Sequence, residues 1–278
     1  MRDTDAGTKD LEISDELHGE PLEIQMGPSH PATHGTVRIT LKLDGERIVD
    51  ADIQVGYLHR GYEKECESGE WSQAIPYTDR LNYASPMINN VGYCLAAEKL
   101  LGVTVPPRGQ YIRTIASEVS RLSDHFTCIG ASAMELAAMT PFLYGIQARE
   151  HMWDLHEALC GARVTTNYVR IGGLQSDLPP GFADLCREKL RLALEIFADV
   201  DRLLTQNPIF RERMEGTGRL PAADLIAYGV TGPLLRAAGV GYDVRKAEPY
   251  LVYDQVDFDV PVGTSGDNYD RYLVRVEE

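Results

Sequence analysis

Alternating apolar and polar residues mark the N-terminal part of the chain. The stretch "TVRITLKLDGERIVDADIQV" alternates on both sides of Asp44-Gly45. An Asp-Gly pair tolerates the positive φ angles that a tight hairpin turn requires. The pattern therefore predicts antiparallel strands over residues 36–56.

Helical periodicity replaces this alternation after Glu63. The stretch "YASPMINNVGYCLAAEKLLG" stops at Gly102, and "VPPRG" separates it from the next segment, as expected of helix ends. From residue 110 onward, apolar residues recur every three or four positions, which predicts one face of a long helix. They are Ile112, Ile115, Val119, Leu122, Phe126, Ile129, Ala133 and Leu136.

The remaining segments predict further helices and one strand. Residues 141–160 begin with Pro141, which suits a first helical turn, and residues 182–208 carry another apolar stripe. Residues 220–240 predict short helices broken by glycine. The stretch 250–260, "YLVYDQVDFDV", resembles a strand, and the chain ends on "YDRYLVRVEE", a helix-initiating pattern without a stop signal.

These elements predict an α+β fold that is mainly α, a long-helix bundle with a small N-terminal antiparallel β-sheet. We divide the sequence into a flexible acidic tail (1–21), the sheet with its following loop (22–63), a helical bundle (64–240) and an irregular or β return segment (241–278). The last segment ends abruptly, as if an architecture were cut short.

One segment could be mistaken for a membrane span. Residues 126–147 contain a single formal charge, Glu135. A carboxylate in mid-membrane costs about 2.5–3.5 kcal/mol, and too few large apolar residues surround it to compensate. We therefore expect this segment to be buried in protein, which makes Glu135 a carboxylate in apolar surroundings that needs a partner.

Composition narrows the possible partners. The chain has 42 acidic and 27 basic residues and a formal net charge of -15, so its average surface repels phosphate and makes nucleic acid a poor partner. Its five cysteines form no C-x-x-C pair, which favours a reducing cytoplasm. The polar first twenty residues resemble neither a secretion signal nor a transit peptide.

Histidine and tyrosine residues supply the candidate chemistry. His30 and His34 lie in "MGPSHPATHG", directly before the first predicted strand, and Tyr83 closes "IPYTDRLNY". Imidazole and phenol groups can hydrogen-bond an oxygen and also release a proton, which suits a carbonyl compound that is being reduced. The structural alternatives are a stiff surface loop for the histidines and helix packing for the tyrosine.

Seven motifs, in the order of the sequence, carry a resemblance to a known family. They are "GPSHPATHG", "GYLHRGYEK", "IPYTDRLNY", "MTPFLYGIQARE", "NYVRIGGLQSDLP", "TGPLLRAAGVGYDVRKAEPY" and "GDNYDRYLVR". From about Glu23 to Glu278, the chain resembles the quinone-site subunits of respiratory complex I, the D subunits of NADH-quinone oxidoreductases. This family shares its fold with the large subunits of nickel-iron hydrogenases.

The resemblance implies a subunit of the peripheral arm of a proton-translocating oxidoreductase, on the cytoplasmic side of the membrane. Quinone would be its substrate, reduced in a cavity shared with a small iron-sulfur subunit, and the cluster would belong to that partner. The chain itself would hold neither a metal nor an iron-sulfur cluster. Other expected partners are further peripheral-arm subunits and the quinone-channel subunit of the membrane arm.

The resemblance also implies residue roles. His34 and Tyr83 match the family's quinone-binding histidine and tyrosine, and Glu135 matches an aspartate that partners the histidine. His30 would shape the loop, while Arg60 and Arg80 match basic residues near the partner's cluster. No activity is expected from the isolated chain.

Two departures from the family pattern affect these expectations. Glu135 replaces the aspartate, so its carboxyl group is displaced by one methylene and a direct contact with His34 is a hypothesis. Thr165 stands where relatives commonly have a histidine, so a pH dependence that such a histidine gives the cluster is left open for this chain.

Two alternatives remain beside the quinone-site function. A nickel-iron hydrogenase would need R-x-C-G-x-C, but Asn82 and Ser85 stand at the two cysteine positions and supply no soft sulfur ligand. A non-catalytic scaffold or fragment in a hydrogenase-like membrane complex is the second. The electron donor (NADH, a reduced deazaflavin or a ferredoxin) and the quinone type stay open.

Overall fold

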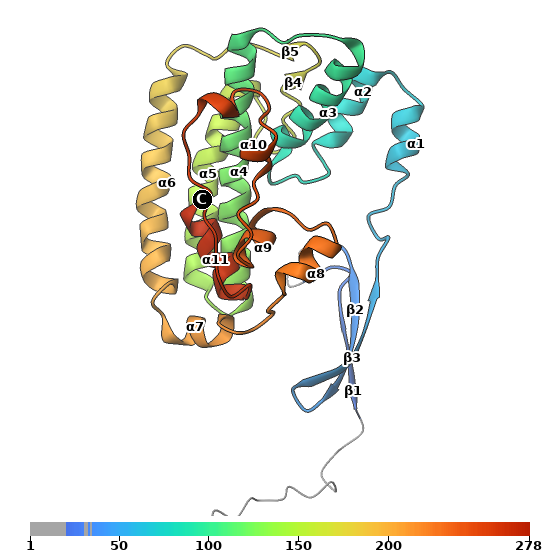
Figure 1. The fold of residues 1–278 in the computed structure, drawn as a ribbon, viewed down its shortest axis with the longest axis vertical. Helices are drawn as coiled ribbons and strands as arrows, with labels where there is room; N and C mark the ends of the chain where they lie inside the picture. Colours follow the sequence, from blue (N-terminus) through green and yellow to red (C-terminus); the bar gives the residue numbers. More distant parts are fainter. Residues whose placement is uncertain (1–20, 31–32, 34) are drawn as a thin grey trace, which may run out of the picture. The chain divides into compact units, whose positions relative to one another are not determined.

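Two units make up the computed structural model, one ending at Arg60 and the other running from Gly61 to Glu278 (Figure 1). The structure describes residues 21–30, 33 and 35–278. The predicted acidic tail, residues 1–21, therefore falls outside the described residues except for its last position.

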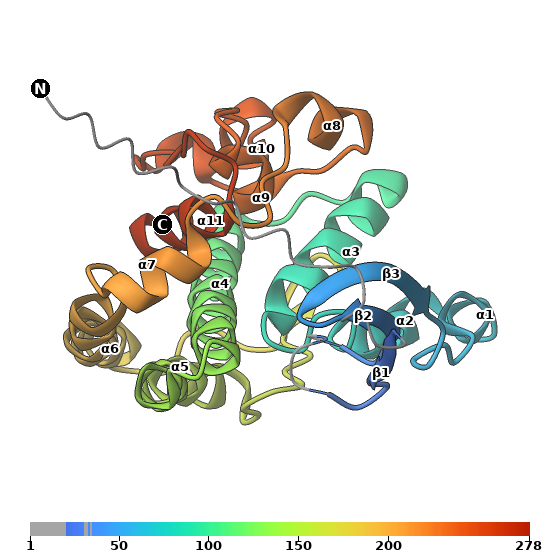
Figure 2. The same cartoon turned by 90° about the horizontal axis from the view of Figure 1, so that it is seen from below.

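The first unit is a three-stranded antiparallel sheet in the order β1-β2-β3 (Figure 2). Its strands are β1 (Leu22–Met26), β2 (Arg38–Asp44) and β3 (Arg47–Gln54). Asp44 pairs with Arg47, and Gly45 between them has a φ of 60°, which only a residue tolerant of the left-handed region adopts readily. The hairpin predicted over residues 36–56 is confirmed, and β1 is an additional strand that was not predicted from the sequence.

The second unit is mainly helical, as predicted for the bundle (Figure 1). Its helices are α1 (Tyr62–Glu67), α2 (Trp71–Thr78), α3 (Pro86–Leu101), α4 (Pro107–Glu135), α5 (Met139–Cys160), α6 (Phe182–Leu204), α7 (Pro208–Met214), α8 (Ala222–Ala227), α9 (Gly232–Ala237), α10 (Val244–Ala247) and α11 (Asn268–Glu277). A short hairpin, β4 (Val169–Arg170) with β5 (Gly173–Leu174), and a 3₁₀ turn, η3 (Tyr253–Gln255), complete it.

Helix ends follow the sequence signals. α3 ends at Gly102, which has a φ of 68°, because a left-handed residue closes the last turn. α4 has Pro107 in its first position, where the missing N–H costs nothing. The predicted long helix and the helices over 141–160 and 182–208 are confirmed as α4, α5 and α6.

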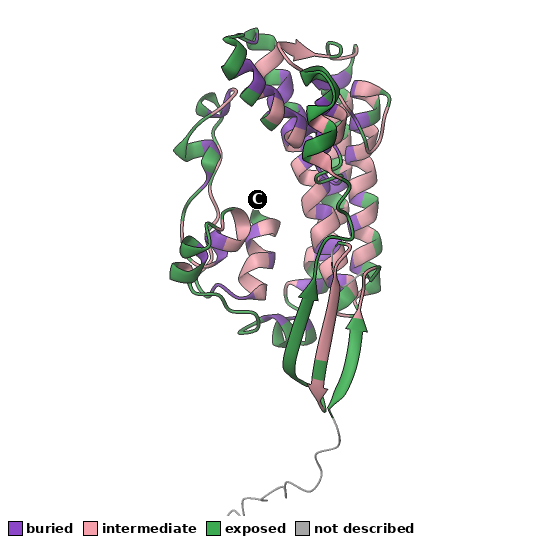
Figure 3. Cartoon of the chain, turned by 90° about the vertical axis from the view of Figure 1, so that its right-hand side faces the viewer, coloured by how far each residue is buried: buried purple, intermediate pink, exposed green. Residues whose placement is uncertain are grey.

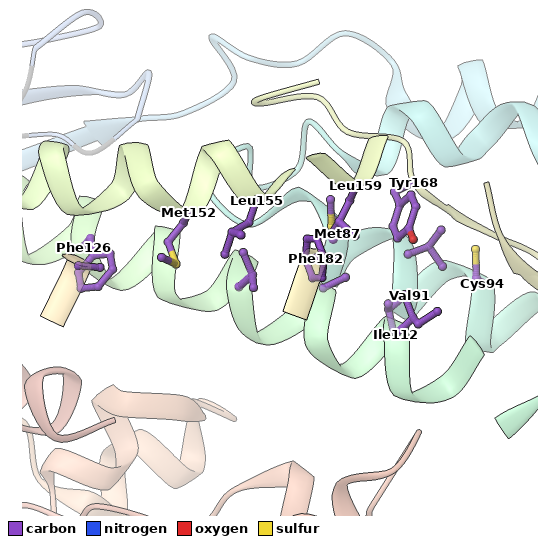
Figure 4. Close-up of a cluster of buried hydrophobic side chains, with 14 of the residues drawn as sticks. Met87, Val91, Cys94, Ile112, Phe126, Met152, Leu155, Leu159, Tyr168 and Phe182 are labelled. Carbon is purple, nitrogen blue, oxygen red and sulfur yellow. The ribbon is translucent and has the colours of Figure 1, made fainter. Parts of the chain in front are cut away.

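The core of this unit lies where α4 packs along α5 and α5 along α6. Met152 and Leu155 of α5 are fully buried between α4 and the rest of the unit (Figure 4). Buried residues recur along these helices, with half-buried residues between them (Figure 3). Apart from Ile115, which is exposed, the apolar stripe read from the sequence over 112–136 is therefore a packing face of the bundle.

Two glycines allow α4 and α5 to approach each other closely. A Cβ atom at Gly145 would lie 3.0 Å from the Phe126 carbonyl oxygen and 3.2 Å from the Gly130 Cα atom. A Cβ atom at Gly130 would lie 3.4 Å from the Phe142 carbonyl oxygen. Backbone atoms cannot move aside as a side chain can, so this crossing depends on glycine.

We expect Gly145→Leu to lower the free energy of unfolding by about 1–3 kcal/mol, because the added side chain forces the two backbones apart. The midpoint of chemical denaturation measures this loss. Gly92→Leu is the matched control, since Gly92 is an exposed position of α3 where a Cβ atom meets nothing within 4 Å. Equal destabilisation by both variants would contradict the close crossing.

The prediction of a strand over residues 250–260 is wrong. The structure has the 3₁₀ turn η3 there and no strand within 241–278, all of which it describes. The alternation reflects aromatic packing instead: the Tyr253 ring lies 4.8 Å from Tyr250 and 6.2 Å from Phe258 between ring centroids. No neighbouring strand in this segment offers backbone groups for a ladder.

The segment over residues 126–147 does not form one continuous helix. α4 ends at Glu135, and Ala137 adopts a φ of 65° before α5 begins at Met139. None of the helices in the described ranges combines the length and apolarity that a membrane crossing requires.

Candidate functional site

The turn between α2 and α3 carries two of the predicted site residues, Arg80 and Tyr83. α2 ends at Thr78, and the N–H groups of Arg80 and Leu81 donate to the carbonyls of Tyr77 and Thr78 at 3.2 and 3.1 Å. Pro86 then opens α3. The Tyr83 side chain is 65% exposed, so its phenol is presented to whatever lies beside this turn.

Asn82 anchors the turn. Its Nδ2 donates to the Ser85 hydroxyl at 2.8 Å and to the Asp124 carboxylate at 3.4 Å, and its carbonyl accepts from Asn89 at 3.2 Å. Asp124 belongs to α4 and Asn89 to α3. The backbone on the N-terminal side of Tyr83 is therefore held by two helices of the bundle.

Arg80 points back along α2. Its guanidinium donates to the Pro76 carbonyl, and the residue is exposed. A permanent positive charge thus lies three residues before the Tyr83 phenol on the same turn.

The loop after α5 meets the turn at a buried carboxyl group. Asp79, the residue that caps α2 at its C-terminus, is 0% exposed, and its Oδ2 accepts the N–H of Asn167 at 3.0 Å. Burial raises the pKa of this carboxyl group above its ordinary value, against the opposing effect of hydrogen bonds and of Arg80 and Arg170. Thr165, two residues before Asn167, is exposed.

Glu135 is not the buried carboxylate that the sequence predicts. It is the last residue of α4 and is exposed, because the chain turns away at Ala137 and leaves the end of the helix open to solvent. Asp124, where the Tyr83 turn meets α4, lies eleven residues earlier, which is about 16 Å along a helix. The structure therefore places Glu135 at a different level of α4 from the turn anchor.

The first unit contains the other predicted residues. His30 is exposed and forms a β-bridge with Gly35, and its carbonyl accepts from Thr33 Oγ1 at 2.8 Å. Arg60 is exposed at the end of this unit. His34 lies outside the described residues, so its place with Tyr83 in one quinone site and its contact with Glu135 stay predictions.

A second polar cluster joins α4 to the C-terminal segment and was not predicted from the sequence. Arg236 and Arg245 pair with Glu278 at 2.7 and 3.0 Å, and the Tyr253 hydroxyl donates to Glu118 at 2.7 Å. Although burial opposes its charge, the neighbouring Arg121 lowers the pKa of Glu118. These residues line a cavity of about 410 Å³. The spacing E-x-x-R on one helix was the only local signal for it.

The described residues include no group of three or more His, Cys, Asp or Glu side chains arranged for a metal ion. All five cysteines are free thiols, and burial raises the pKa of Cys94 to about 11. A buried neutral thiol of this kind is unreactive.

Comparison with known proteins gives a consistent set of relatives. The family model "Respiratory-chain NADH dehydrogenase, 49 Kd subunit" matches residues 135–278. The chain is 52% identical over 276 residues to the D subunit of the NADH-quinone oxidoreductase of Myxococcus xanthus, an alignment that covers 99% of this chain and 66% of the relative.

Two further relatives agree. Identity is 54% over 263 residues to the first of the numbered D subunits of Sorangium cellulosum, covering 95% of this chain and 65% of the relative. It is 50% over 267 residues to the C/D subunit of Bdellovibrio bacteriovorus, covering 95% of this chain and 47% of the relative. The chain thus spans between 47% and 66% of the lengths of these three relatives.

Proposed function

Because the chain belongs to the family of the 49 Kd subunit of respiratory-chain NADH dehydrogenase, we propose that it is a subunit of an NADH-quinone oxidoreductase and walls the cavity in which quinone is reduced. The curated relatives are named as D subunits of NADH-quinone oxidoreductases. Quinone is then the substrate that reaches this chain.

The exposed phenol of Tyr83 is the observation that carries this proposal. A tyrosine that served only for packing would bury its ring, whereas Tyr83 is 65% exposed on a turn fixed to α3 and α4. A rigid turn with an outward phenol is suited to present a hydrogen-bond donor to a flat carbonyl compound.

Reduction of a quinone to a quinol adds two electrons and two protons, so negative charge builds on its two oxygens. Donors already aimed at these oxygens stabilise that charge and deliver the protons. Tyr83 donates its phenolic O–H to one oxygen and His34 an imidazole N–H to the other. Each group then regains a proton from solvent.

Glu135 assists the histidine in this proposal. A carboxylate near an imidazole favours its charged form and keeps a proton available at neutral pH. Glu135 is exposed at the end of α4, so its carboxylate lies at the surface of the helical unit.

The proposed partners follow from the same family membership. A small iron-sulfur subunit forms the other wall of the cavity and delivers the electrons from its cluster, near which Arg60 and Arg80 add positive charge. His30 shapes the loop that carries His34. Other peripheral-arm subunits and the quinone-channel subunit of the membrane arm complete the assembly, which is peripheral on the cytoplasmic side and coupled to proton translocation.

Quinone reduction by the complete complex tests the proposal. In membranes that contain the full-length subunit, we expect His34→Ala and Tyr83→Phe each to lower quinone turnover by about 10²-fold, the smaller end of what a positioned proton donor contributes. Electron transfer to an artificial acceptor that bypasses the quinone should stay unchanged.

Tyr228→Phe is the matched control, because Tyr228 is an exposed tyrosine on a different segment. Wild-type quinone turnover in both site variants would overturn the site assignment and favour the scaffold alternative. Equal loss toward both acceptors would point to failed assembly, which the amount of complex in the membrane measures directly.

A further inference from the structure

A fully buried carboxyl group lies directly beneath the Tyr83 turn. Asp79 is 0% exposed and precedes Tyr83 by four residues. Its Oδ2 accepts the N–H of Asn167 at 3.0 Å, but its Oδ1 has no hydrogen-bond partner among the described residues. A carboxylate oxygen left without a donor in the interior is costly.

The Asn90 side-chain oxygen is a second buried acceptor without a hydrogen-bond donor among the described residues. Asn90 of α3 is also 0% exposed, and it lies beside the Asp79 carboxyl group, whose pKa its side chain lowers. Its Nδ2 donates to the Ile75 carbonyl at 3.3 Å and to the Thr78 hydroxyl at 2.8 Å. Its Oδ1 has no partner within the described chain.

The orientation of the Asn90 amide is fixed by its donors. The Thr78 hydroxyl uses its own hydrogen to donate to the Ile75 carbonyl at 2.7 Å, so towards Asn90 it can only accept. Turning the amide over would set Oδ1 against two acceptors. Asn90 Oδ1 therefore needs a donor from elsewhere.

One proton satisfies both oxygens. We propose that Asp79 is held as a neutral carboxylic acid and acts as a positioning residue: its Oδ1–H donates to Asn90 Oδ1 while its Oδ2 accepts the Asn167 N–H. The bond to Asn167 ties the start of the Tyr83 turn to the loop after α5, and the bond to Asn90 ties it to α3. This inference rests on the proposed function, in which the direction of the Tyr83 phenol matters.

Arg80 and Arg170 lower the pKa of Asp79 by their charge, against the larger effect of burial, but in the described structure neither bonds to its carboxyl group. Arg80 on the turn donates to the Pro76 carbonyl, and Arg170 of β4 donates to the Asn167 carbonyl and to Asn167 Oδ1 at 2.6 Å. Cys160 faces Asp79 from α5, and burial raises the pKa of that thiol, so it adds no charge.

Among the described residues, no side chain donates a hydrogen bond to Asp79 Oδ1. The Thr166 hydroxyl, in the loop that Asp79 holds, is buried and itself lacks a hydrogen-bond partner in the part of the chain that the structure describes. It is therefore not bonded to Asp79 Oδ1. Burial leaves Asp79 Oδ1 and Asn90 Oδ1 without water. It also raises the pKa of Asp79, which favours the neutral acid.

Two substitutions, made in the complete membrane complex, test whether Asp79 acts as a neutral acid or as a carboxylate. An Asp79→Asn side chain is neutral, and its NH₂ and C=O groups reproduce both bonds of the acid, so we expect a KM for quinone near the wild-type value. Asp79→Ala removes both bonds, and we expect KM to rise about tenfold as the turn loses its position. Asp177→Asn, an exposed carboxylate paired with Arg108, is the control.

The pH dependence and the infrared spectrum supply readouts that a purely structural role would not move. With rising pH the wild-type KM should increase as Asp79 ionises, while that of Asp79→Asn stays flat. The infrared difference between wild type and Asp79→Asn at neutral pH should contain the carbonyl band of a protonated carboxyl group. A carboxylate band in its place overturns the proposal.

The outcomes are distinguishable from a failure of the proposed function. If Tyr83→Phe leaves quinone reduction unchanged, the quinone-site function fails, and the infrared difference still decides whether Asp79 carries its proton. If Asp79→Asn raises KM as much as Asp79→Ala, the charged form is required and the neutral acid is excluded. An unchanged KM in Asp79→Ala excludes the positioning role.

Discussion

Replacing Arg113 with methionine is expected to lower the free energy of unfolding by about 3–5 kcal/mol, because it leaves a buried carboxylate without its partner. Arg113 of α4 is 0% exposed and forms a two-pronged ion pair with Glu98 of α3 at 2.6 and 2.9 Å. Its guanidinium also donates to the carbonyls of Arg170 and Gly173 at 2.7 and 3.0 Å. Glu98 in turn accepts the Gly172 N–H at 2.7 Å.

The measurement is a double-mutant cycle by chemical denaturation. Glu98→Leu should also destabilise strongly, whereas the combined Arg113→Met and Glu98→Leu variant should recover part of the loss, since it leaves no unpaired charge. Arg108→Met, which breaks the exposed pair with Asp177, should change stability little. Additive losses in the double variant would mean that the two residues do not act as a pair.

This pair explains how the β4-β5 hairpin is held against the bundle. Two-residue strands are too short to be stable by themselves, and the Arg113 and Glu98 side chains satisfy backbone groups on both sides of the tip. The loop that precedes β4 is the one that Asp79 holds at Asn167. Two buried polar contacts thus hold the last residues of this loop and the hairpin that follows it.

The helices were predictable because their signals are local. Apolar residues at intervals of three and four, Pro107 and Pro141 in first turns, and Gly102 at an end all act within a few residues of the chain. The Asp44-Gly45 hairpin is local in the same sense. These elements are present in the structure close to the predicted ranges.

Features that depend on tertiary contacts were not predictable. Leu136 continues the apolar stripe of α4, and the reversal at Ala137 uses a positive φ at a residue that is not glycine, so nothing local announced the end of the helix. Because the end of α4 was not predicted, Glu135 was predicted to be buried. The alternation over 250–260 comes from stacked aromatic rings, which sequence periodicity cannot distinguish from a strand.

The candidate site likewise has a part set by local sequence and a part set by tertiary contacts. Arg80 and Tyr83 are three residues apart in the sequence, so local structure keeps them together; the structure places both on the turn before Pro86 opens α3. The carboxyl group of Asp79, by contrast, is defined by Asn90 and Asn167, which are distant in sequence. The residues adjacent to Asp79 along the chain gave no sign that its carboxyl group is buried.

Stability should fall as the solution is acidified from pH 7 to pH 4, and His156 should account for about 3 kcal/mol of the loss. His156 of α5 is fully buried. Its Nδ1 bonds to the Arg163 carbonyl at 3.3 Å and its Nε2 to the Ser120 hydroxyl at 3.1 Å. A carbonyl only accepts, so Nδ1 carries the hydrogen and Nε2 accepts from Ser120.

Burial lowers the pKa of His156 from 6.5 to about 4. The unfolded chain binds a proton at this residue below pH 6.5 while the folded chain does not, so its contribution to stability is complete above pH 6.5. It is lost as the pH falls towards 4, at about 1.4 kcal/mol for each pH unit, and no further change occurs below the folded-state pKa.

His156→Gln should be less stable than wild type at pH 7, because a core side chain is exchanged, yet should lose less stability between pH 7 and pH 4. Denaturation midpoints at several pH values measure the two slopes. Burial also lowers the pKa of His125, which contributes in both chains and cancels in the comparison. Equal slopes in wild type and His156→Gln would show that the imidazole already takes up its proton in the folded core.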